Sequence, residues 1–443
     1  MKISLQKYPA YIDSGVEWLG EIPSNWEVTK LRNIGVFSAS GIDKYLKINE
    51  SKVKIINFTD IYANKSMTLD SSFDYMVVTT PESNRSKHLV KKGDLIFLPS
   101  SETYEDLGAA ALVNEELENT SFSYHVIRLV FQKEIEHAFR KYLTNNAFVL
   151  NQFSRQGKGS TRKIIGRGVF KDVQVIIPPL PEQTAIAAFL DRKTALIDQA
   201  IDIKQKQIEL LKERRQILIH KAVTRGLNPN VKMKDSGVEW IGEIPEGWEV
   251  KRLKNSTRIF RGKFTHRPRN DERLYDGNYP FFQTGDVAKA GKYLSEYKQT
   301  LNDFGLRVST LFPKGTIVIT IAANIGDISI LDINACFPDS IVGFEPMDFI
   351  ERDFLYNSLL VMKEQFMSST IKNTQMNLNV DRIGTNSIAI PTLKEQVEII
   401  KHIEIASTKI DTAISLKEQE IEMLKEYKAT LINSAVTGKV KVV

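Results

Sequence analysis

The most constraining feature of this sequence is a duplication on the scale of half the chain. Residues 13–29 (DSGVEWLGEIPSNWEVT) return almost unchanged as residues 235–251 (DSGVEWIGEIPEGWEVK), 222 positions later. This period is far longer than the repeat units of solenoid proteins. The sequence therefore predicts two similar halves and not an array of short repeats.

The shared register continues into the interior of each half. Lys92–Phe97 (KGDLIF) and Lys314–Ile319 (KGTIVI) are also 222 positions apart, and each is typical of a glycine turn that leads into a buried strand. Asn57–Ile61 and Gln283–Val287 correspond at an offset of 226. Further runs predicted as strands are Val126–Phe131, Val173–Ile177 and Thr316–Ile321.

Each half ends in a long amphipathic segment. Residues 182–222 contain no Gly or Pro, and their apolar positions alternate at spacings of four and three, as in a coiled-coil seam. The pattern recurs 213 residues later with its polar exceptions, so the two helices are expected to pack along each other. The predicted seam residues are Leu190, Ile197, Ile201, Ile208, Leu211, Leu218, Ile403, Ile410, Ile414, Ile421, Leu424 and Leu431.

The resulting expectation is an α+β chain with two homologous globular domains and two helical regions. The boundaries fall at residues 1–177 and 227–389 for the globular domains, and at 178–226 and 390–443 for the helical regions. A chain of 443 residues is too long for a single core, which agrees with this division.

Composition narrows the class of protein. No apolar run approaches the roughly 20 residues that span a bilayer, so no membrane segment and a cytosolic location are expected. Cys336 is the only cysteine, which excludes an intrachain disulfide and a cysteine-based metal site. The formal net charge of +6 is compatible with a polyanionic partner.

Motifs for catalysis are absent from the sequence. A base methyltransferase needs a glycine-rich cofactor loop and an Asn/Asp-Pro-Pro-aromatic motif, but the only Pro-Pro pair, Pro178-Pro179, has other neighbours. The nuclease-like triplet Glu249–Lys251 has the repeat partner Glu27–Thr29, which lacks the lysine. The six histidines show no ligand spacing. We therefore expect neither a catalytic nor a metal site, with a cryptic methyltransferase or nuclease as the alternative.

Two basic loops are the best candidates for binding. Residues 154–163 are cationic and rich in hydrogen-bond donors, and at the offset of 213 they correspond to residues 367–376. Residues 261–269 form a second basic run, whose counterpart near Lys44 is less basic. Arg and Gln suit bidentate reading of guanine and adenine edges. The predicted DNA-binding residues are Lys44, Lys158, Thr161, Arg162, Lys163, Arg261, Lys263, His266, Arg267, Arg269, Thr374, Gln375 and Asn377.

The four tryptophans belong to the duplicated segment. Because two different targets would need different readers, Trp18, Trp26, Trp240 and Trp248 are predicted to be packing anchors and not base-stacking residues. The polar seam positions are interpreted as setting helix register or as snorkelling to the surface; they are Lys204, Arg215, Lys417 and Lys428.

With these residues considered together, the chain resembles the DNA-specificity subunits of type I restriction–modification systems over nearly its whole length. The resemblance rests on the doubled SGVEW-[LI]-GEIP-x-x-WEV segment, on the paired KGDLI and KGTIV strands, and on PPLPEQ (178–183) and TLKEQ (392–396) before the long helices. Thr392 and Lys394 replace two prolines of the first copy.

The resemblance implies two target-recognition domains separated by an antiparallel coiled coil, with internal pseudo-twofold symmetry. It implies recognition of a split double-stranded DNA target, and association with two methyltransferase subunits and with motor–nuclease subunits. S-adenosylmethionine, ATP and Mg²⁺ would then be bound by those partners, with no cofactor in this chain. A coiled-coil adaptor that binds no nucleic acid is a further alternative.

Overall fold

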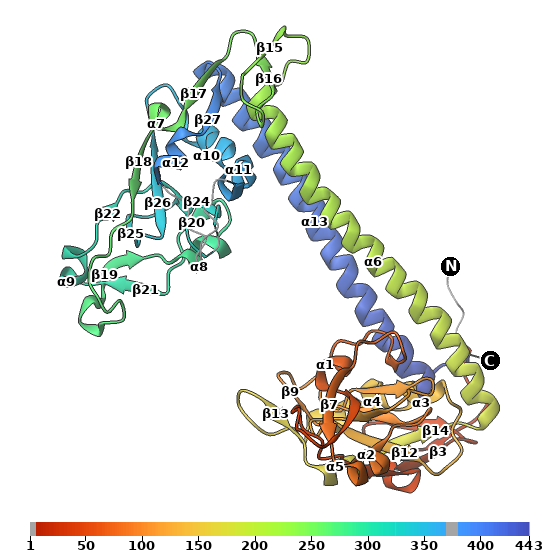
Figure 1. Cartoon of the computed structure of the whole chain (residues 1–443). Helices are drawn as coiled ribbons and strands as arrows, with labels where there is room; N and C mark the ends of the chain where they lie inside the picture. The colour runs from red at the N-terminus through yellow and green to blue at the C-terminus, as the bar shows by residue number, and fades with distance from the viewer. Residues whose placement is uncertain (1–5, 324, 369–379, 443) are drawn as a thin grey trace. The chain divides into compact units, whose positions relative to one another are not determined.

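A computed structural model describes residues 6–323, 325–368 and 380–442. The chain divides into two compact units (Figure 1): unit 1 comprises Met1–Lys204 with Gln419–Val443, and unit 2 comprises Gln205–Glu418. The longest helices, α6 (Leu180–Arg225) and α13 (Leu393–Val436), each contribute one part to each unit.

Among the described residues, unit 1 contains the first fourteen strands and six short helices, one of them a 3-10 helix. Its strands are β1 (Tyr11–Asp13), β2 (Glu21–Pro23), β3 (Glu27–Lys30), β4 (Gly35–Ser38), β5 (Ser51–Ile56), β6 (Thr68–Leu69), β7 (Met76–Thr80), β8 (Leu95–Phe97), β9 (Ser100–Ser101), β10 (Ala110–Val113), β11 (Thr120–Phe122), β12 (Ile127–Phe131), β13 (Lys163–Ile164) and β14 (Gln174–Ile177). Its helices are η1 (Leu31–Asn33), α1 (Phe58–Ile61), α2 (Glu82–His88), α3 (Phe139–Thr144), α4 (Ala147–Ser154) and α5 (Arg167–Asp172).

Unit 2 repeats this series. Its strands are β15 (Met233–Asp235), β16 (Glu243–Pro245), β17 (Glu249–Arg252), β18 (Thr257–Arg261), β19 (Tyr275–Phe281), β20 (Tyr293–Leu294), β21 (Gln299–Leu301), β22 (Leu311–Phe312), β23 (Ile317–Thr320), β24 (Ile328–Leu331), β25 (Ala335–Cys336), β26 (Ile341–Pro346) and β27 (Ser387–Ile390). Its helices are α7 (Leu253–Ser256), η2 (Glu272–Leu274), α8 (Thr284–Lys289), α9 (Asp303–Arg307), α10 (Arg352–Val361), α11 (Lys363–Ser368) and α12 (Val380–Thr385).

The main sheets of the two units have the same topology, and their smaller sheets share three strands. The main sheet has the order β4-β12-β8-β10-β6 in unit 1 and β18-β26-β23-β24-β20 in unit 2, antiparallel except for the last pair of each. A smaller sheet contains β11-β5-β7 in unit 1 and β25-β19-β21 in unit 2, each with one parallel and one antiparallel pair. The duplication seen in the sequence is therefore a duplication of fold.

The corresponding turns agree at the level of single residues. Gly93 and Gly315 precede β8 and β23, and both have φ of 93°, a left-handed conformation that glycine adopts without steric cost. The helices α1 and α8 both begin with a capping box, in which Asp60 accepts a hydrogen bond from the Asn57 amide and Asp286 accepts one from the Gln283 amide. These pairs confirm the predicted correspondences.

The helices α6 and α13 pack antiparallel within each unit, as predicted. Eight of the twelve predicted seam residues are buried, among them Leu190 and Ile208 of α6 and Ile403 and Ile421 of α13. The other four, Ile201, Leu211, Leu218 and Leu424, are half-buried. Burying these side chains supplies the main stabilisation of a pair of helices whose outer faces are polar.

Ion pairs across the helix pair fix its register. Lys428 binds Asp198 at 2.7 Å in unit 1, and Arg215 binds Asp411 at 2.6 Å in unit 2. Each residue of the first pair corresponds to one residue of the second at the offset of 213. The Nζ of Lys204 contacts Glu420 at 2.5 Å. Lys204, Arg215 and Lys428 thus have cross-helix acidic partners, which supports their role in helix register.

Near the start of each long helix, a buried glutamine joins the helix to its globular domain through hydrogen bonds. The side chain of Gln183 donates to the Pro178 carbonyl and accepts from the Glu136 amide, at 2.7 and 2.9 Å. The side chain of Gln396 donates to the Pro391 carbonyl and accepts from the Glu351 amide, at 3.0 and 2.7 Å. Buried amides satisfied in this way hold one orientation, because losing a partner would leave a buried polar group unpaired.

Tryptophans pack beside these helix starts. Trp26 and Trp248 are buried, and their indole N–H groups donate to Glu182 and Glu395 at 3.0 and 3.4 Å. Their predicted role as packing anchors is confirmed. Trp18 is 42% exposed and stacks on Phe148 with ring centroids 4.7 Å apart.

The C-terminal ends of the helices meet the tryptophans of the opposite repeat. Gly226, after α6, lies against Trp248 in unit 2, and Gly438, after α13, lies against Trp26 in unit 1. Both glycines have positive φ, near 70°. A Cβ at Gly438 would lie 2.3 Å from the Pro23 ring, so glycine is required there for the close approach as well as for the turn.

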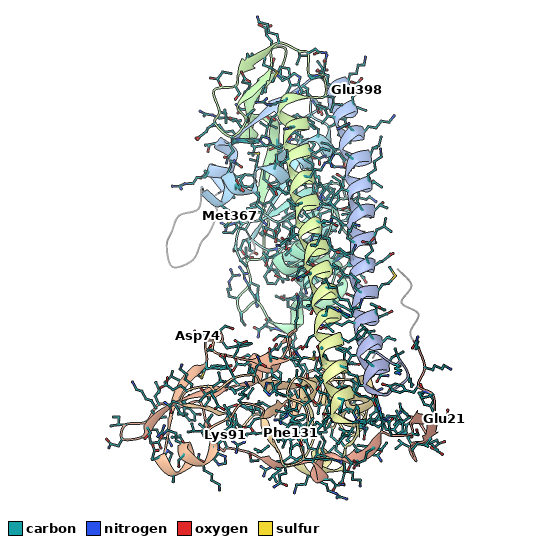
Figure 2. All side chains as sticks on the ribbon, turned by 90° about the vertical axis from the view of Figure 1, so that its right-hand side faces the viewer. Glu21, Asp74, Lys91, Phe131, Met367 and Glu398 are labelled. Atoms are coloured by element: carbon teal, nitrogen blue, oxygen red, sulfur yellow. The ribbon has the colours of Figure 1, made fainter. Side chains whose placement is uncertain are left out.

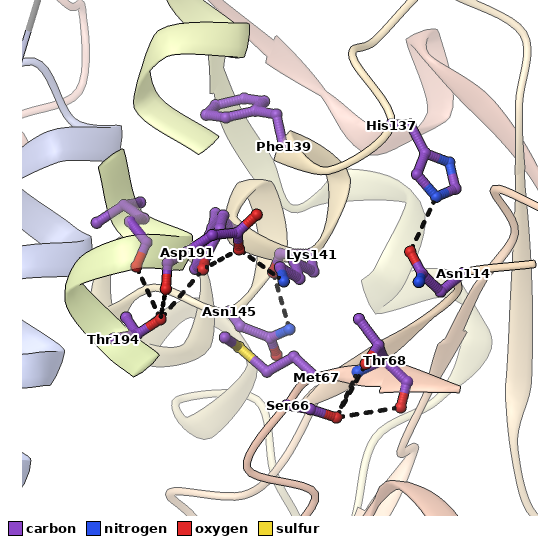
Figure 3. A network of polar contacts seen from close by, with 12 residues as sticks. Ser66, Met67, Thr68, Asn114, His137, Phe139, Lys141, Asn145, Asp191 and Thr194 are labelled. Carbon is purple, nitrogen blue, oxygen red and sulfur yellow. Dashed lines mark hydrogen bonds and ion pairs between the residues drawn. The ribbon is translucent and has the colours of Figure 1, made fainter. Parts of the chain in front are cut away.

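A polar network fastens α6 to the globular part of unit 1 (Figure 3). Asp191 of α6 accepts a hydrogen bond from the Tyr142 hydroxyl at 2.7 Å and forms an ion pair with Lys141 at 2.8 Å. Thr194 lies 3.4 Å from the same hydroxyl and donates to the Leu190 carbonyl. In unit 2 the equivalent of Asp191 is Glu404, which binds Lys292 at 3.1 Å.

Candidate functional site

The loop before α5 forms a cationic hairpin on the surface of unit 1. Residues 157–164 fold back so that Lys158 and Ile164 bridge, and β13 pairs with β9. Lys158, Thr161 and Arg162 are exposed and Lys163 is half-buried. Of the predicted binding residues, these four are thus brought onto one short turn.

Aromatic rings hold the cations of this hairpin in place. The Arg162 guanidinium lies 4.8 Å from the centre of the Phe58 ring, and its Nε donates to the Ser100 hydroxyl at 3.1 Å. The Nζ of Lys163 lies 5.1 Å from the centre of the Tyr104 ring. A cation over an aromatic face is attracted by the ring quadrupole, so these two charges have defined positions before any ligand binds.

His125 links the hairpin to the loop that contains Lys44. Burial lowers the pKa of His125, and the positive charges of Lys44 and Arg162 lower it further. Its ring packs on Tyr124 with centroids 3.8 Å apart. Lys44 and Arg162, far apart in the sequence, therefore act on the same imidazole. We call Lys44, His125 and Lys158–Lys163 the cationic face of unit 1.

Sequence reasoning missed the aromatic and histidine members of this face. Phe58, Tyr104 and the adjacent pair Tyr124–His125 come from three separate segments, and only the packing of β9, β13 and α1 brings them to the hairpin. No sequence motif predicts these residues as part of a binding face, because an exposed tyrosine in a loop has the same sequence context whether or not it faces a ligand.

The basic run of unit 2 follows β18 and is organised by two aspartates. Asp339 contacts Arg269 at 2.5 Å and Arg267 at 3.7 Å, and its backbone carbonyl accepts from the Arg261 Nε at 2.6 Å. His266 contacts Asp271 at 2.8 Å.

These contacts change the electrostatics expected from the sequence. The pKa of Asp271 is held well below its usual range, with Arg273 as the main cause and His266 as a further one. The run is therefore less positive than its composition indicates. Of its five predicted binding residues, Arg261 and Lys263 have no ion pair among the described residues, and both are exposed. The other predicted residues of unit 2, Thr374, Gln375 and Asn377, lie outside the described residues.

Unit 2 also contains a groove of about 1420 Å³ between the C-terminal part of α6 and α8, β20, α10 and α11. Its charged lining is paired internally: Arg215 with Asp411, Lys292 with Glu404 and Asp353, and Lys363 with Asp327. Although burial alone would lower it, these carboxylates raise the pKa of Lys292 to about 12. Paired charges of this kind are typical of structural networks and give no acid–base pair for catalysis.

No metal centre or membrane span is found in the part of the chain that the structure describes. Its His, Cys, Asp and Glu side chains form no group of three or more that could hold a metal ion. None of its helices combines the length and the apolar character that crossing a bilayer requires. The Glu249–Lys251 triplet lies on β17 as one exposed ion pair of 2.8 Å between Lys251 and Glu249.

Comparison with known proteins identifies relatives of both units. Residues 23–213 and 245–426 match the family described as type I restriction modification DNA specificity domain. The chain is 25% identical over 433 residues to a putative type I restriction enzyme MjaX specificity subunit of Methanocaldococcus jannaschii, covering 96% of each protein. It is 27% identical over 301 residues to the MjaVIII specificity subunit of the same organism, covering 65% of this chain and 67% of that protein.

A solved structure has the same fold. A chain from a structural study of complex assembly and conformational transition of the type I R-M system superimposes with a TM-score of 0.69, at 16% identity, covering 95% of this chain and 99% of that one. At this identity the likeness concerns the fold.

Proposed function

The chain belongs to the type I restriction–modification DNA specificity family, and we propose that its two globular domains, 1–177 and 227–389, each read one half of a split DNA target. The observation that carries this proposal is the difference in chemistry at equivalent places of a duplicated fold. The strands β4 and β18 occupy the same edge of their sheets, yet different loops follow them. The loop after β4 exposes apolar side chains, whereas the loop after β18 exposes arginines.

The chemistry of methylation and cleavage is proposed to belong to partner subunits. The groove of unit 2 is lined by paired charges, whereas an active site would need unpaired, convergent ones. S-adenosylmethionine would accordingly bind to methyltransferase subunits, and ATP and Mg²⁺ to motor–nuclease subunits. The paired charges of the groove therefore favour a DNA-recognition subunit over the alternative of a stand-alone methyltransferase or nuclease.

An exposed apolar stripe on α6 is the proposed docking surface for the methyltransferase subunits. It consists of residues at heptad spacing, with exposures between 48% and 62%: Leu196, Ile203, Leu210 and Ile217. At the offset of 213, α13 repeats its two central members as Leu416 and Met423, 54% and 59% exposed. An exposed heptad stripe is typical of a helix that receives a further helix. Figure 2 draws the side chains of α6 and α13 as sticks.

Domain exchange tests the reading function. Replacing residues 30–176 with the equivalent segment of a relative should change one half of the methylated DNA motif and leave the other half intact. The motif is read by sequencing modified bases in cells that carry the complete system. Changes in both halves would contradict the assignment of one domain to one half-site.

Co-purification tests the docking surface. Leu210→Glu places a charge within the stripe and should abolish capture of the methyltransferase subunit. Lys212→Glu is the matched control, because at about 100° per residue it lies some 200° around α6 from Leu210. Loss of capture with both variants would point to damage of the helix pair.

A further inference from the structure

The loop between β4 and β5 exposes three apolar side chains together. Tyr45, Leu46 and Ile48 are 64%, 71% and 92% exposed, and we call them the apolar triad. Leaving side chains of this size in water forgoes roughly 1.5–3 kcal/mol each compared with full burial. Isolated exposed apolar residues are common on proteins, but three within four positions indicate a surface that is covered in use.

The backbone of this loop is anchored. The Thr79 amide of β7 donates to the Tyr45 carbonyl at 3.1 Å, and the Lys47 amide donates to the Thr79 hydroxyl at 2.7 Å. Asn49, directly after the triad, has φ of 72°, a left-handed turn that asparagine tolerates better than most residues. The triad is therefore presented on a defined turn, which lowers the conformational entropy lost when it meets a partner.

Lysines flank the triad in the sequence and on the strand that follows it. Lys52 and Lys54 of β5 are the cross-strand partners of Thr79 and Val77, so they share the face on which the loop is anchored. Lys44 precedes the triad and belongs to the cationic face. These three lysines have no ion pair among the described residues, whereas Lys47 faces Glu50 at 3.9 Å. An apolar triad flanked by lysines without ion pairs complements a partner that carries apolar rings between rows of negative charge. Duplex DNA is such a partner, because its stacked bases lie between two phosphate backbones.

The equivalent loop of unit 2 is built differently. After β18 the apolar Phe264 is turned inward and is 2% exposed, while Arg261, Arg267 and Arg269 face outward. The two loops occupy the same topological position, so the contrast is one of contact chemistry and not of fold.

From the anchored loop, its exposure and its lysines we infer that the apolar triad inserts into the base stack of the first half-site, while Lys44, Lys52 and Lys54 hold the flanking phosphates. Apolar wedges of this kind partly unstack one base step and kink the duplex. Unit 1 would thereby read the deformability of its half-site, in addition to base edges, whereas unit 2 reads with arginine. This inference rests on the proposed function and specifies how one of its two readers works.

The test uses the full chain in complex with its methyltransferase subunits, and a duplex that carries the motif mapped by methylation sequencing. A 2-aminopurine is placed at each position of both half-sites in turn. The wild-type complex should raise the fluorescence severalfold at one step of the first half-site. The double variant Leu46→Ser/Ile48→Ser should lose that signal, and its affinity should fall about tenfold, the effect of roughly 1.4 kcal/mol of lost apolar contact.

Two controls separate the possible outcomes. Ile12→Ser removes a side chain of 45% exposure on β1, outside the loop, and should leave both the signal and the affinity unchanged. A wild-type complex that methylates a split motif but gives no enhancement in the first half-site overturns the wedge while the proposed function stands. Failure to methylate any split motif overturns both. If the double variant keeps the fluorescence signal but no longer captures the methyltransferase subunit, the triad is a protein-docking surface and the inference is wrong.

Discussion

At the scale of single residues, the cationic face is a set of charges positioned in advance. Arg162 and Lys163 lie over aromatic rings, and Lys44 and Arg162 both act on His125. Long cationic side chains normally lose rotamer freedom when they bind. Fixing them over rings reduces that loss, and thereby favours binding at this face over binding at other lysines and arginines of the surface.

We predict that Arg162→Ala weakens binding of the target duplex by about 1–3 kcal/mol if the guanidinium reads a base edge. Arg162→Lys distinguishes the two kinds of contact, because lysine keeps the charge and loses the bidentate geometry. A base contact requires that both variants lose discrimination between target and non-target DNA. A phosphate contact requires that Lys restores binding and that Ala weakens all sequences alike, with a smaller salt dependence.

His125 should make DNA binding dependent on pH. Its pKa is lowered in the free protein, first by burial and then by Lys44 and Arg162. Nearby phosphates favour the charged imidazole, so the pKa is higher in the complex than in the free protein, and binding takes up a proton. Affinity should therefore increase about three- to tenfold as the pH falls from 7.5 to 5.5, since one pKa unit corresponds to a factor of ten.

Titrating His125→Gln and His402→Gln beside the wild type checks this prediction. His402 lies exposed on α13 and serves as the control. The pH-dependent gain should disappear in His125→Gln and persist in His402→Gln. An unchanged pH profile in His125→Gln would show that the imidazole does not face the DNA.

At the scale of elements, the sequence predicts what depends on periodicity and repetition. The seam of α6 and α13, the strands β8 and β23 after Gly93 and Gly315, and the correspondence of residues 57–61 with 283–287 follow from local spacing and repetition. The candidate interface depends on contacts between distant segments, and local spacing does not encode these. The contact of Phe58 with Arg162, and the contacts of Asp339 with Arg267 and Arg269, join residues that are far apart in the sequence. Only the folded structure shows them.

The two symmetry-related ion pairs of the helix seam should contribute unequally. The side chains of Lys428 and Asp198 are 17% and 28% exposed, compared with 30% and 58% for Arg215 and Asp411. Because solvent screens exposed pairs, we predict a coupling energy of about 0.5–1 kcal/mol for the first pair and about 0.2–0.5 kcal/mol for the second. Double-mutant cycles in urea, with alanine at each position, measure both couplings. Equal values would mean that burial does not decide the strength of these pairs.

At the scale of the whole molecule, both long helices continue from one unit into the other, α6 at Lys204–Gln205 and α13 at Glu418–Gln419. The helix pair is thus a candidate ruler for the spacer between the two half-sites. Inserting four residues at both places keeps the ion pairs of each unit in register and lengthens each helix by about 6 Å, since an α-helix rises about 1.5 Å per residue.

Such a double insertion should lengthen the spacer of the methylated motif by one or two base pairs, at about 3.4 Å each. Rotation favours the lower value and rise the higher one: four residues exceed one helical turn by about 40°, close to the rotation of about 35° for one base pair, whereas a rise of about 6 Å is close to that of two pairs. Sequencing of modified bases measures the spacer. A variant with the insertion in α6 alone should be less stable, because the seam loses register. A spacer that remains fixed in the double-insertion variant would exclude the ruler.

The crossed ends of the helices have an evolutionary consequence. Gly226 of the first repeat seats against Trp248 of the second, and Gly438 of the second against Trp26 of the first, so neither repeat supplies all the parts of its own unit. A gene encoding one repeat would yield a protein that becomes complete only as a symmetric homodimer reading a palindrome. Fusion of two such genes frees each copy to mutate its loops independently. Recognition of an asymmetric target would then have evolved from recognition of a palindrome. Exchange of DNA between related genes within the helix segment would create new specificities without disturbing either hydrophobic core.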